Sequence, residues 1–135
     1  MNADLSKLIY SGRLPSWHIL RGKTVFQLIF QNGKVIPARY ILLRYRIVPD
    51  EPCDKRVGFI VGKRLGKAVK RNKVKRHMRE AYRTNKHLMA DLLTQQQFGI
   101  HYLFMARSVS ASFHEIEKEC CKLMTTLQKR VYPAD

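Results

Sequence analysis

The feature that most constrains this chain is a strongly basic stretch between two apolar, strand-like runs. The stretch extends from Lys63 to Arg83 and holds ten Lys or Arg residues against one acid, Glu80, so it contributes +9 to a formal net charge of +16. The runs RVGFIVG at 56–62 and IHYLFMAR at 100–107 flank it. A helix that joins two neighbouring strands makes them parallel. We therefore expect a basic crossover helix between two parallel strands.

Helical periodicity divides the basic stretch and its continuation into two sides. At 100° per residue from Val74, one apolar side carries Met78, Ala81, Asn85, Leu88 and Leu92. The opposite side carries Asn72, Lys75, Arg76, Arg79 and Arg83. The pattern predicts one long helix with one face in the core and one face in solvent.

The segments before the basic stretch predict a helix and a series of strands. Residues 23–32 carry closely spaced apolar side chains and are followed by Gly33, which is typical of a short helix and its end. Residues 35–48 alternate in character and are interrupted by Pro37, which predicts a short strand and then a long one. We expect the long strand to form an antiparallel hairpin with the run at 56–62, across the turn at 49–52.

The last helix is marked by a capping box, in which Ser112 is followed three residues later by Glu115. The predicted order is α-β-β-β-α-β-α in a single α+β domain, a two-layer sandwich with a mixed sheet. We expect residues 1–20 to form an irregular N-terminal arm and residues 21–132 to form the folded domain.

Cysteine and histidine usage indicates a reducing compartment and no metal centre. Cys53, Cys120 and Cys121 form no C-x-x-C pair and are odd in number, and we expect Cys120 to pack as a small apolar side chain. The five histidines show no spacing that suits a metal site, so no zinc is expected. No apolar run has the length of a membrane span, and we expect a cytoplasmic protein without a membrane partner.

Three roles are open to the basic helix: a solvated face, a DNA-reading helix or an RNA-binding surface. One acid among ten bases is self-repelling unless a polyanion neutralises the charge, which disfavours a solvated face. Helix-turn-helix readers of DNA place a second helix beside the reading helix, whereas strands are predicted on both sides here. A nucleic acid is the favoured partner.

The order of residues in the string KRLGKAVKRNKVKR, at 63–76, is more specific than its charge. It resembles the RNR signature of the bacterial ribonuclease P protein subunit. The helix with Phe26 and Phe30, the segment RVGFIVGKR, the segment YLFMAR and the closing helix also occur in the order of that family. The resemblance extends over residues 20–130, with two departures. Lys73 stands at the third position of the Arg-Asn-Arg triplet, and the N-terminal arm carries fewer basic residues than the family pattern implies.

The resemblance implies a role beside a catalytic RNA. Ribonuclease P removes the 5′ leader of precursor tRNA, and in bacteria the RNA subunit and its Mg²⁺ ions are the catalyst. The family fold is similar to that of a ribosomal protein and has a left-handed βαβ crossover. The implied partners are the catalytic RNA and precursor tRNA, with no obligate protein partner and no metal bound by the protein alone. The implied RNA-binding residues are Lys63, Arg64, Lys67, Arg71, Asn72, Lys73, Lys75, Arg76 and Arg79.

The resemblance also implies a cleft for the single-stranded leader, between the first helix and the sheet. The candidate residues are Phe26, Phe30, Tyr40, Arg44 and Arg46. Aromatic rings stack on unpaired bases of any identity, which suits a leader of variable sequence. The alternative is that the two phenylalanines, four residues apart, are core residues.

No catalytic residue is expected in the polypeptide. Hydrolysis of RNA by a protein requires clustered carboxylates for metal ions or a positioned pair of histidines. The ten acids are dispersed, and the one cluster, at Glu115, Glu117 and Glu119, fits the electrostatics of a helix start. A non-enzymatic basic RNA-binding protein, for instance of the ribosome, remains the alternative function.

Overall fold

The fold was analysed in a computed structural model, which describes residues 14–133. Residues 1–13 of the predicted arm lie outside the described residues. The elements are η1 (Ser16–His18), α2 (Lys23–Asn32), β1 (Lys34–Pro37), β2 (Ile41–Val48), β3 (Lys55–Ile60), η2 (Lys63–Leu65), α3 (Ala68–Asn85), η3 (Lys86–Met89), α4 (Ala90–Thr94), β4 (Gly99–Ala106) and α5 (Phe113–Val131). The predicted single α+β domain with a mixed sheet is confirmed.

The four strands lie in the order β1-β2-β4-β3, with β4 in the interior of the sheet. β4 runs antiparallel to β2 and parallel to β3. The parallel pair joined by the basic helix was therefore predicted correctly. The predicted hairpin between the long strand and residues 56–62 is wrong, because β4 lies between those two strands.

The connection from β2 to β3 shows how β4 is accommodated. A Cβ atom at Gly99, the first residue of β4, would lie 2.2 Å from the carbonyl oxygen of Glu51 and 2.7 Å from that of Asp54. The amide of Ile100 donates to the Asp54 carbonyl at 2.8 Å. The connection thus passes against the start of β4 where only a glycine fits. A turn at 49–52 is compatible with the predicted β2–β3 hairpin and with the observed insertion of β4 between the two strands. The local sequence therefore did not distinguish the two strand orders.

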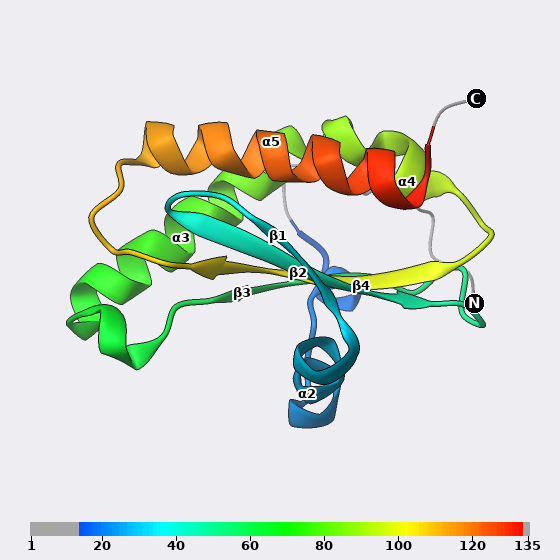
Figure 1. Cartoon of the computed structure of the whole chain (residues 1–135), viewed down its shortest axis with the longest axis horizontal. Helices are drawn as coiled ribbons and strands as arrows, with labels where there is room; N and C mark the ends of the chain where they lie inside the picture. Colours follow the sequence, from blue (N-terminus) through cyan, green and yellow to red (C-terminus); the bar gives the residue numbers. More distant parts are fainter. Residues whose placement is uncertain (1–13, 134–135) are drawn as a thin grey trace.

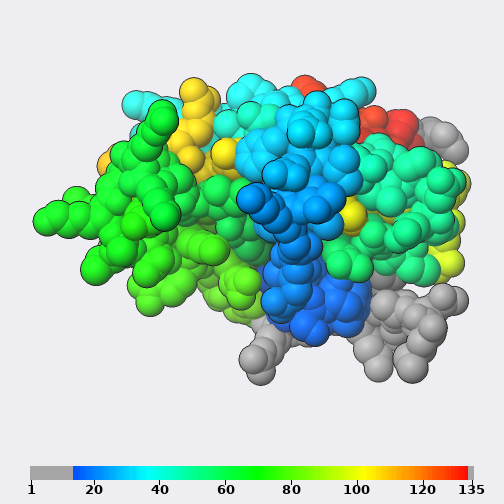
Figure 2. Space-filling view, turned by 90° about the horizontal axis from the view of Figure 1, so that it is seen from below, coloured from blue at the N-terminus to red at the C-terminus, as the bar shows by residue number. Residues whose placement is uncertain are grey.

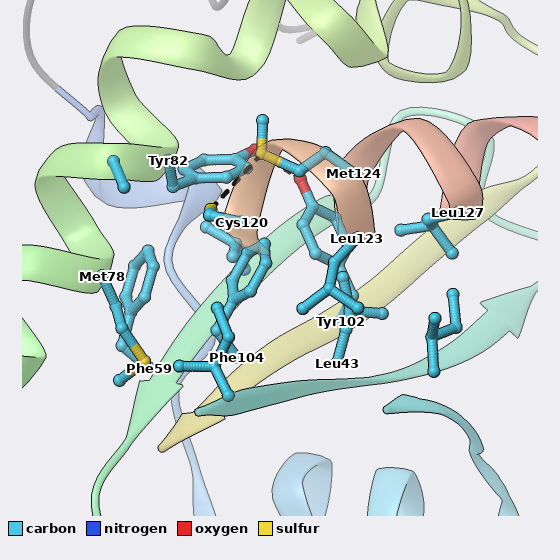
Figure 3. Close-up of a cluster of buried hydrophobic side chains, with 14 of the residues drawn as sticks. Leu43, Phe59, Met78, Tyr82, Tyr102, Phe104, Cys120, Leu123, Met124 and Leu127 are labelled. Atoms are coloured by element: carbon cyan, nitrogen blue, oxygen red, sulfur yellow. Dashed lines mark hydrogen bonds between the residues drawn. The ribbon is translucent and has the colours of Figure 1, made fainter. Parts of the chain in front are cut away.

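The main core lies on one face of the sheet, beneath α3 and α5 (Figure 1). Ile41, Leu43 and Tyr45 alternate along β2 and all are buried in this core. In Figure 3, side chains from α3, α5 and the strands converge there. Cys120 is fully buried, with its Sγ 3.6 Å from the sulfur of Met124, so it packs as predicted.

The helices of this layer begin and end for local reasons. α5 starts with the predicted capping box, in which the Ser112 hydroxyl accepts from the Glu115 amide at 3.1 Å. The predicted long helix is wrong beyond Asn85, where α3 ends and η3 and α4 follow. The Asn85 side chain donates to the Ala81 carbonyl at 2.9 Å and to Glu117 of α5 at 3.1 Å. This amide competes with backbone helix formation and redirects the chain.

Of the helices that the structure describes, only α2 lies on the other face of the sheet (Figure 1). It covers a small cluster made by Leu20, Ile29 and Leu103, with Phe26 and Ile60 packed against it. The predicted helix at 23–32 is confirmed, and it adds a small layer to the layer of α3 and α5. In the part of the chain that the structure describes, no helix is both long and apolar enough to span a membrane.

Candidate nucleic-acid interface

The basic turn before α3 is shaped by Gly66. Its φ of +153° is rarely adopted by residues with a side chain, and an added Cβ would lie 3.2 Å from a methyl group of Val109. The Arg71 guanidinium donates through Nε to the Gly66 carbonyl at 2.9 Å. Lys63 and Arg64 lie in η2, and Lys67 is the N-cap of α3. The turn and the first helical residues therefore present one connected basic surface.

α3 divides into an apolar and a basic side as predicted. Val74, Met78 and Ala81 are buried. A shallow pocket of about 360 Å³ is lined by Asn72, Lys75, Arg76 and Arg79, with no acid among them. Lys73 is exposed and lies about 200° around the helix from Arg71 at 100° per residue. The RNR-like triplet thus projects to more than one side of α3.

The one acid of α3 is paired within the helix. The Arg83 guanidinium donates through Nε to Glu80 at 3.0 Å, and this hydrogen bond lowers the pKa of the Glu80 carboxyl. His77 packs edge-on against Phe113 with ring centroids 5.3 Å apart, and burial together with Lys73 lowers its pKa. The negative charge of Glu80 is therefore offset by Arg83, and His77 adds no negative charge.

The two phenylalanines of α2, both predicted to line a leader cleft, lie in different surroundings. Phe30 is 41% exposed, and the Arg44 guanidinium lies over its ring, 5.1 Å from the centroid. Phe26 is half-buried, and a Cβ added at Gly58 of β3 would lie 3.1 Å from its ring. Phe30 therefore offers a stacking surface, whereas Phe26 belongs to the small core. Arg46 lies on the same face of β2 as Arg44, two residues further on.

Tyr40 is not part of this cleft, and its predicted place there is wrong. Its amide donates to Glu119 of α5 at 2.8 Å, and a hydrogen bond to the Glu115 carboxylate raises the pKa of its phenol. The Arg39 guanidinium lies 5.1 Å from its ring centroid. These contacts turn the β1–β2 connection toward α5, on the side of the sheet away from α2.

No pattern in the sequence indicated the role of His18. This side chain is fully buried, with Nδ1 2.6 Å from the Lys55 carbonyl and Nε2 2.6 Å from the Tyr82 hydroxyl. The Tyr82 hydroxyl in turn bonds to that of Tyr102. Burial lowers the pKa of His18 to about 4, so the ring is neutral and can donate to the carbonyl and accept from the phenol. With the bridge from Ile19 to β3, His18 fixes residues 15–20 against the domain.

The docked segment brings a further base to α3. Arg21 lines a pocket of about 760 Å³ together with Arg79, Arg83 and the paired acid Glu80. Figure 2 shows α2 crossing the centre of this side of the molecule, with the basic helix and its turn on one side of it. Among residues 14–133, no three His, Cys, Asp or Glu side chains gather as metal ligands.

Known proteins share both the sequence and the fold of this chain. The family model for Ribonuclease P matches residues 14–128. The ribonuclease P protein component of Nitratiruptor sp. is 31% identical, over 82% of this chain and 93% of the relative. That of Natranaerobius thermophilus is 33% identical, over 78% and 89%.

Solved structures agree with the sequence relatives. The ribonuclease P protein of Thermotoga maritima has a TM-score of 0.64 at 26% identity, over 80% of this chain and 96% of that one. The Staphylococcus aureus protein, at 21% identity, shares the fold with a TM-score of 0.67, over 82% and 95%. The chain belongs to the ribonuclease P protein family.

Proposed function

We propose that this chain is the protein subunit of ribonuclease P and assists a catalytic RNA in removing the 5′ leader of precursor tRNA. The observation that carries the proposal is the exposed basic side of α3, whose one acid is paired, together with the stacking pair of Phe30 and Arg44 beside α2. Members of the family to which the chain belongs take part in this reaction together with an RNA subunit.

The basic side of α3 binds phosphates of the catalytic RNA in this proposal. Each phosphate that a Lys or Arg neutralises releases counterions, so the affinity depends steeply on salt. Arg71 is positioned in advance by its bond to Gly66, which lowers the entropy lost on binding. The contact set is that predicted from the sequence: Lys63, Arg64, Lys67, Arg71, Asn72, Lys73, Lys75, Arg76 and Arg79.

The cleft beside α2 binds the single-stranded leader. The exposed ring of Phe30 and the planar guanidinium of Arg44 both stack on bases without regard to their identity. Arg46 lies further along the same face of β2 and supplies charge for the backbone. Such a cleft accepts leaders of different sequence.

The polypeptide contributes charge and shape, and we propose that the RNA subunit holds the Mg²⁺ ions that act in cleavage. The carboxylates on α3, on α5 and at Asp54, just before β3, accept hydrogen bonds that stabilise the fold. Asp54 bonds to Arg56 and His101, Glu80 to Arg83, Glu115 to the Ser112 amide, Glu117 to Asn85 and Glu119 to the Tyr40 amide. The protein would favour Mg²⁺ occupancy indirectly, because it reduces repulsion between two polyanions.

A reconstitution experiment tests this function. Precursor tRNA and catalytic RNA are incubated at limiting Mg²⁺ with and without the protein, and 5′ cleavage is measured. We expect strong stimulation with the protein and no cleavage by the protein without the RNA. Absence of stimulation would contradict the proposal and favour a ribosome-associated RNA-binding protein. Cleavage by the protein alone would contradict the non-catalytic assignment.

A further inference from the structure

The outer face of α5 carries a row of basic side chains that lies outside the contact set of α3. Five exposed residues fall within an arc of about 80° at 100° per residue, and we call them the α5 stripe: His114, Lys118, Lys122, Thr125 and Lys129. Building on the proposed function, we infer that the α5 stripe binds the backbone of a double-helical segment of the catalytic RNA.

The α5 stripe faces away from the leader cleft. The opposite side of α5 is buried in the main core through Ile116, Cys120, Leu123 and Leu127. In Figure 1, α5 lies along the top of the molecule and α2 at the bottom, with the sheet between them. An RNA helix on the α5 stripe therefore leaves the cleft beside α2 free for the leader.

The α5 stripe continues the basic side of α3. Lys73 and His77 lie one helical turn apart on α3, and the His77 ring packs on Phe113 at the start of α5, with ring centroids 5.3 Å apart. His114, the first residue of the α5 stripe, follows Phe113. Lys73 thus lies on the side of α3 that faces α5. An RNA bound to α3 can extend past Lys73 onto α5.

The acids of α5 do not neutralise the α5 stripe. Among residues 14–133, no salt bridge includes a residue of the stripe. Glu115 accepts a hydrogen bond from the amide of the helix cap, Glu117 from a side chain of α3, and Glu119 from amides at the β1–β2 connection. The carboxylates are therefore held at the flanks of α5, and the outer face keeps its positive charge.

Stabilisation of α5 does not explain the two central lysines. Bases near the carboxyl end of a helix interact favourably with its dipole, and Lys129 lies in the last turn. Lys118 and Lys122 lie near the middle of this 19-residue helix, where the dipole has little effect. They are also like charges one turn apart, which repel each other. A bound polyanion would remove this repulsion.

The composition of the α5 stripe indicates a double helix. Surfaces for single-stranded RNA need exposed aromatic rings, and helices that lie on membranes need an exposed apolar face. Among the described residues, the exposed large apolar side chains are Trp17, Phe30, Val35 and Val69, none of them on α5. Lysine binds phosphate as a point charge, and double-helical RNA is recognised largely through its backbone. The lysines extend over about 17 Å along a straight helix, which suits a rigid duplex.

The test measures the affinity of the protein for the catalytic RNA over a range of salt concentrations. The stripe variant Lys118→Gln, Lys122→Gln is compared with the natural chain and with Lys23→Gln, Lys34→Gln, which removes the same charge from exposed positions on α2 and β1. Two lost phosphate contacts lower the salt slope by nearly two. Between about 50 and 200 mM salt, the natural chain should therefore lose about tenfold more affinity than the stripe variant. The control should keep the natural slope.

A nuclease that cuts double-stranded RNA locates the contact. The natural chain should protect a helical segment of the catalytic RNA that stays accessible with the stripe variant. Protection that is lost with Arg71→Ala and kept with the stripe variant marks the RNA bound by α3. Two separate protected segments are expected.

Four other results would overturn the inference. Equal slopes for the natural chain and the stripe variant would leave the α5 stripe in solvent. Equal changes in the stripe variant and the control would assign the effect to net charge. Loss of protection only in single-stranded segments would exclude a duplex. An unchanged slope with lost retention on immobilised polyglutamate would assign the α5 stripe to an acidic protein.

Folding of the variants is checked by thermal unfolding. Melting temperatures should be nearly equal, because Gln and Lys have similar helix propensities. If the stripe variant does not fold, Lys122→Gln alone should lower the slope by about one contact, and an unchanged slope would overturn the inference. Failure of the proposed function is distinguishable, because the natural chain would then not stimulate 5′ cleavage. Failure of the inference leaves that stimulation intact and the slope of the stripe variant unchanged.

Discussion

The buried His18 should make the fold sensitive to acid. Its ring bonds to the Lys55 carbonyl and the Tyr82 hydroxyl, and burial lowers its pKa from 6.5 to about 4. Between these two values the unfolded chain binds a proton that the folded chain does not. Stability therefore falls as the pH falls through this window, and the contribution is fully present above pH 6.5.

The size of the effect follows from the shift in pKa. Each pKa unit corresponds to 1.36 kcal/mol, so protonation of the unfolded chain removes about 3 kcal/mol of stability by pH 4. That is a large part of the stability of a small domain, which is roughly 5–15 kcal/mol. The loss should appear first where residues 15–20 dock on β3, because His18 is the side chain that ties them there.

Urea unfolding at a series of pH values measures this contribution. His18→Gln should be less stable at neutral pH by about 1–3 kcal/mol, since at least one buried hydrogen bond is lost. It should also lose less stability on acidification than the natural chain, by about 3 kcal/mol. His87→Gln, which changes an exposed histidine, is the control.

Asp54 adds acid sensitivity in all three proteins, because His101 and Arg56 outweigh its partial burial and hold the pKa of its carboxyl low. Parallel stability curves for His18→Gln and the natural chain would refute the reasoning.

Three further predictions concern the RNA-binding surfaces. Gly66→Ala should weaken binding to the catalytic RNA and lower stability by about 1 kcal/mol, because φ and Val109 disfavour a side chain; unchanged binding in a filter assay would argue against a shaped turn. Arg71→Ala should reduce the salt dependence of binding by about one phosphate contact, and an unaltered slope would remove Arg71 from the interface. Phe30→Ala should reduce affinity for the leader more than for mature tRNA at nearly constant melting temperature. Phe26→Ala should instead lower the free energy of unfolding by about 2 kcal/mol. If Phe30→Ala lowered stability and Phe26→Ala lowered only leader affinity, the assigned roles of the two rings would be exchanged.

Local physics determined what could be predicted of the fold. The capping box at Ser112 and the alternation along β2 depend on neighbours in the chain, so these elements were predicted correctly. The insertion of β4 between β2 and β3 depends on contacts across some fifty residues, as between Val48 and Gly99. Sequence patterns at the turn carry no information about such a partner, and the hairpin was predicted instead.

In the candidate site too, features set by neighbouring residues could be predicted, whereas features set by tertiary contacts could not. Exposure of the basic side of α3 follows from the apolar spacing of Val74 and Met78, which is visible in the sequence. The burial of His18 and the turning of Tyr40 toward α5 result from tertiary contacts with Tyr82 and Glu119. No local pattern distinguishes these side chains from exposed ones.

The strand order also explains why two phenylalanines on one helix have different roles. Arg44, Leu103 and Gly58 lie side by side in one row across β2, β4 and β3. α2 crosses this row with Leu103 buried beneath it, so that Phe26 lies over Gly58 and Phe30 lies beside Arg44. The missing side chain at Gly58 lets Phe26 pack into the small core, whereas the long guanidinium of Arg44 keeps Phe30 at the surface. A direct β2–β3 pair would remove β4 from between these two positions, and with it the width that separates the core ring from the ring available to RNA.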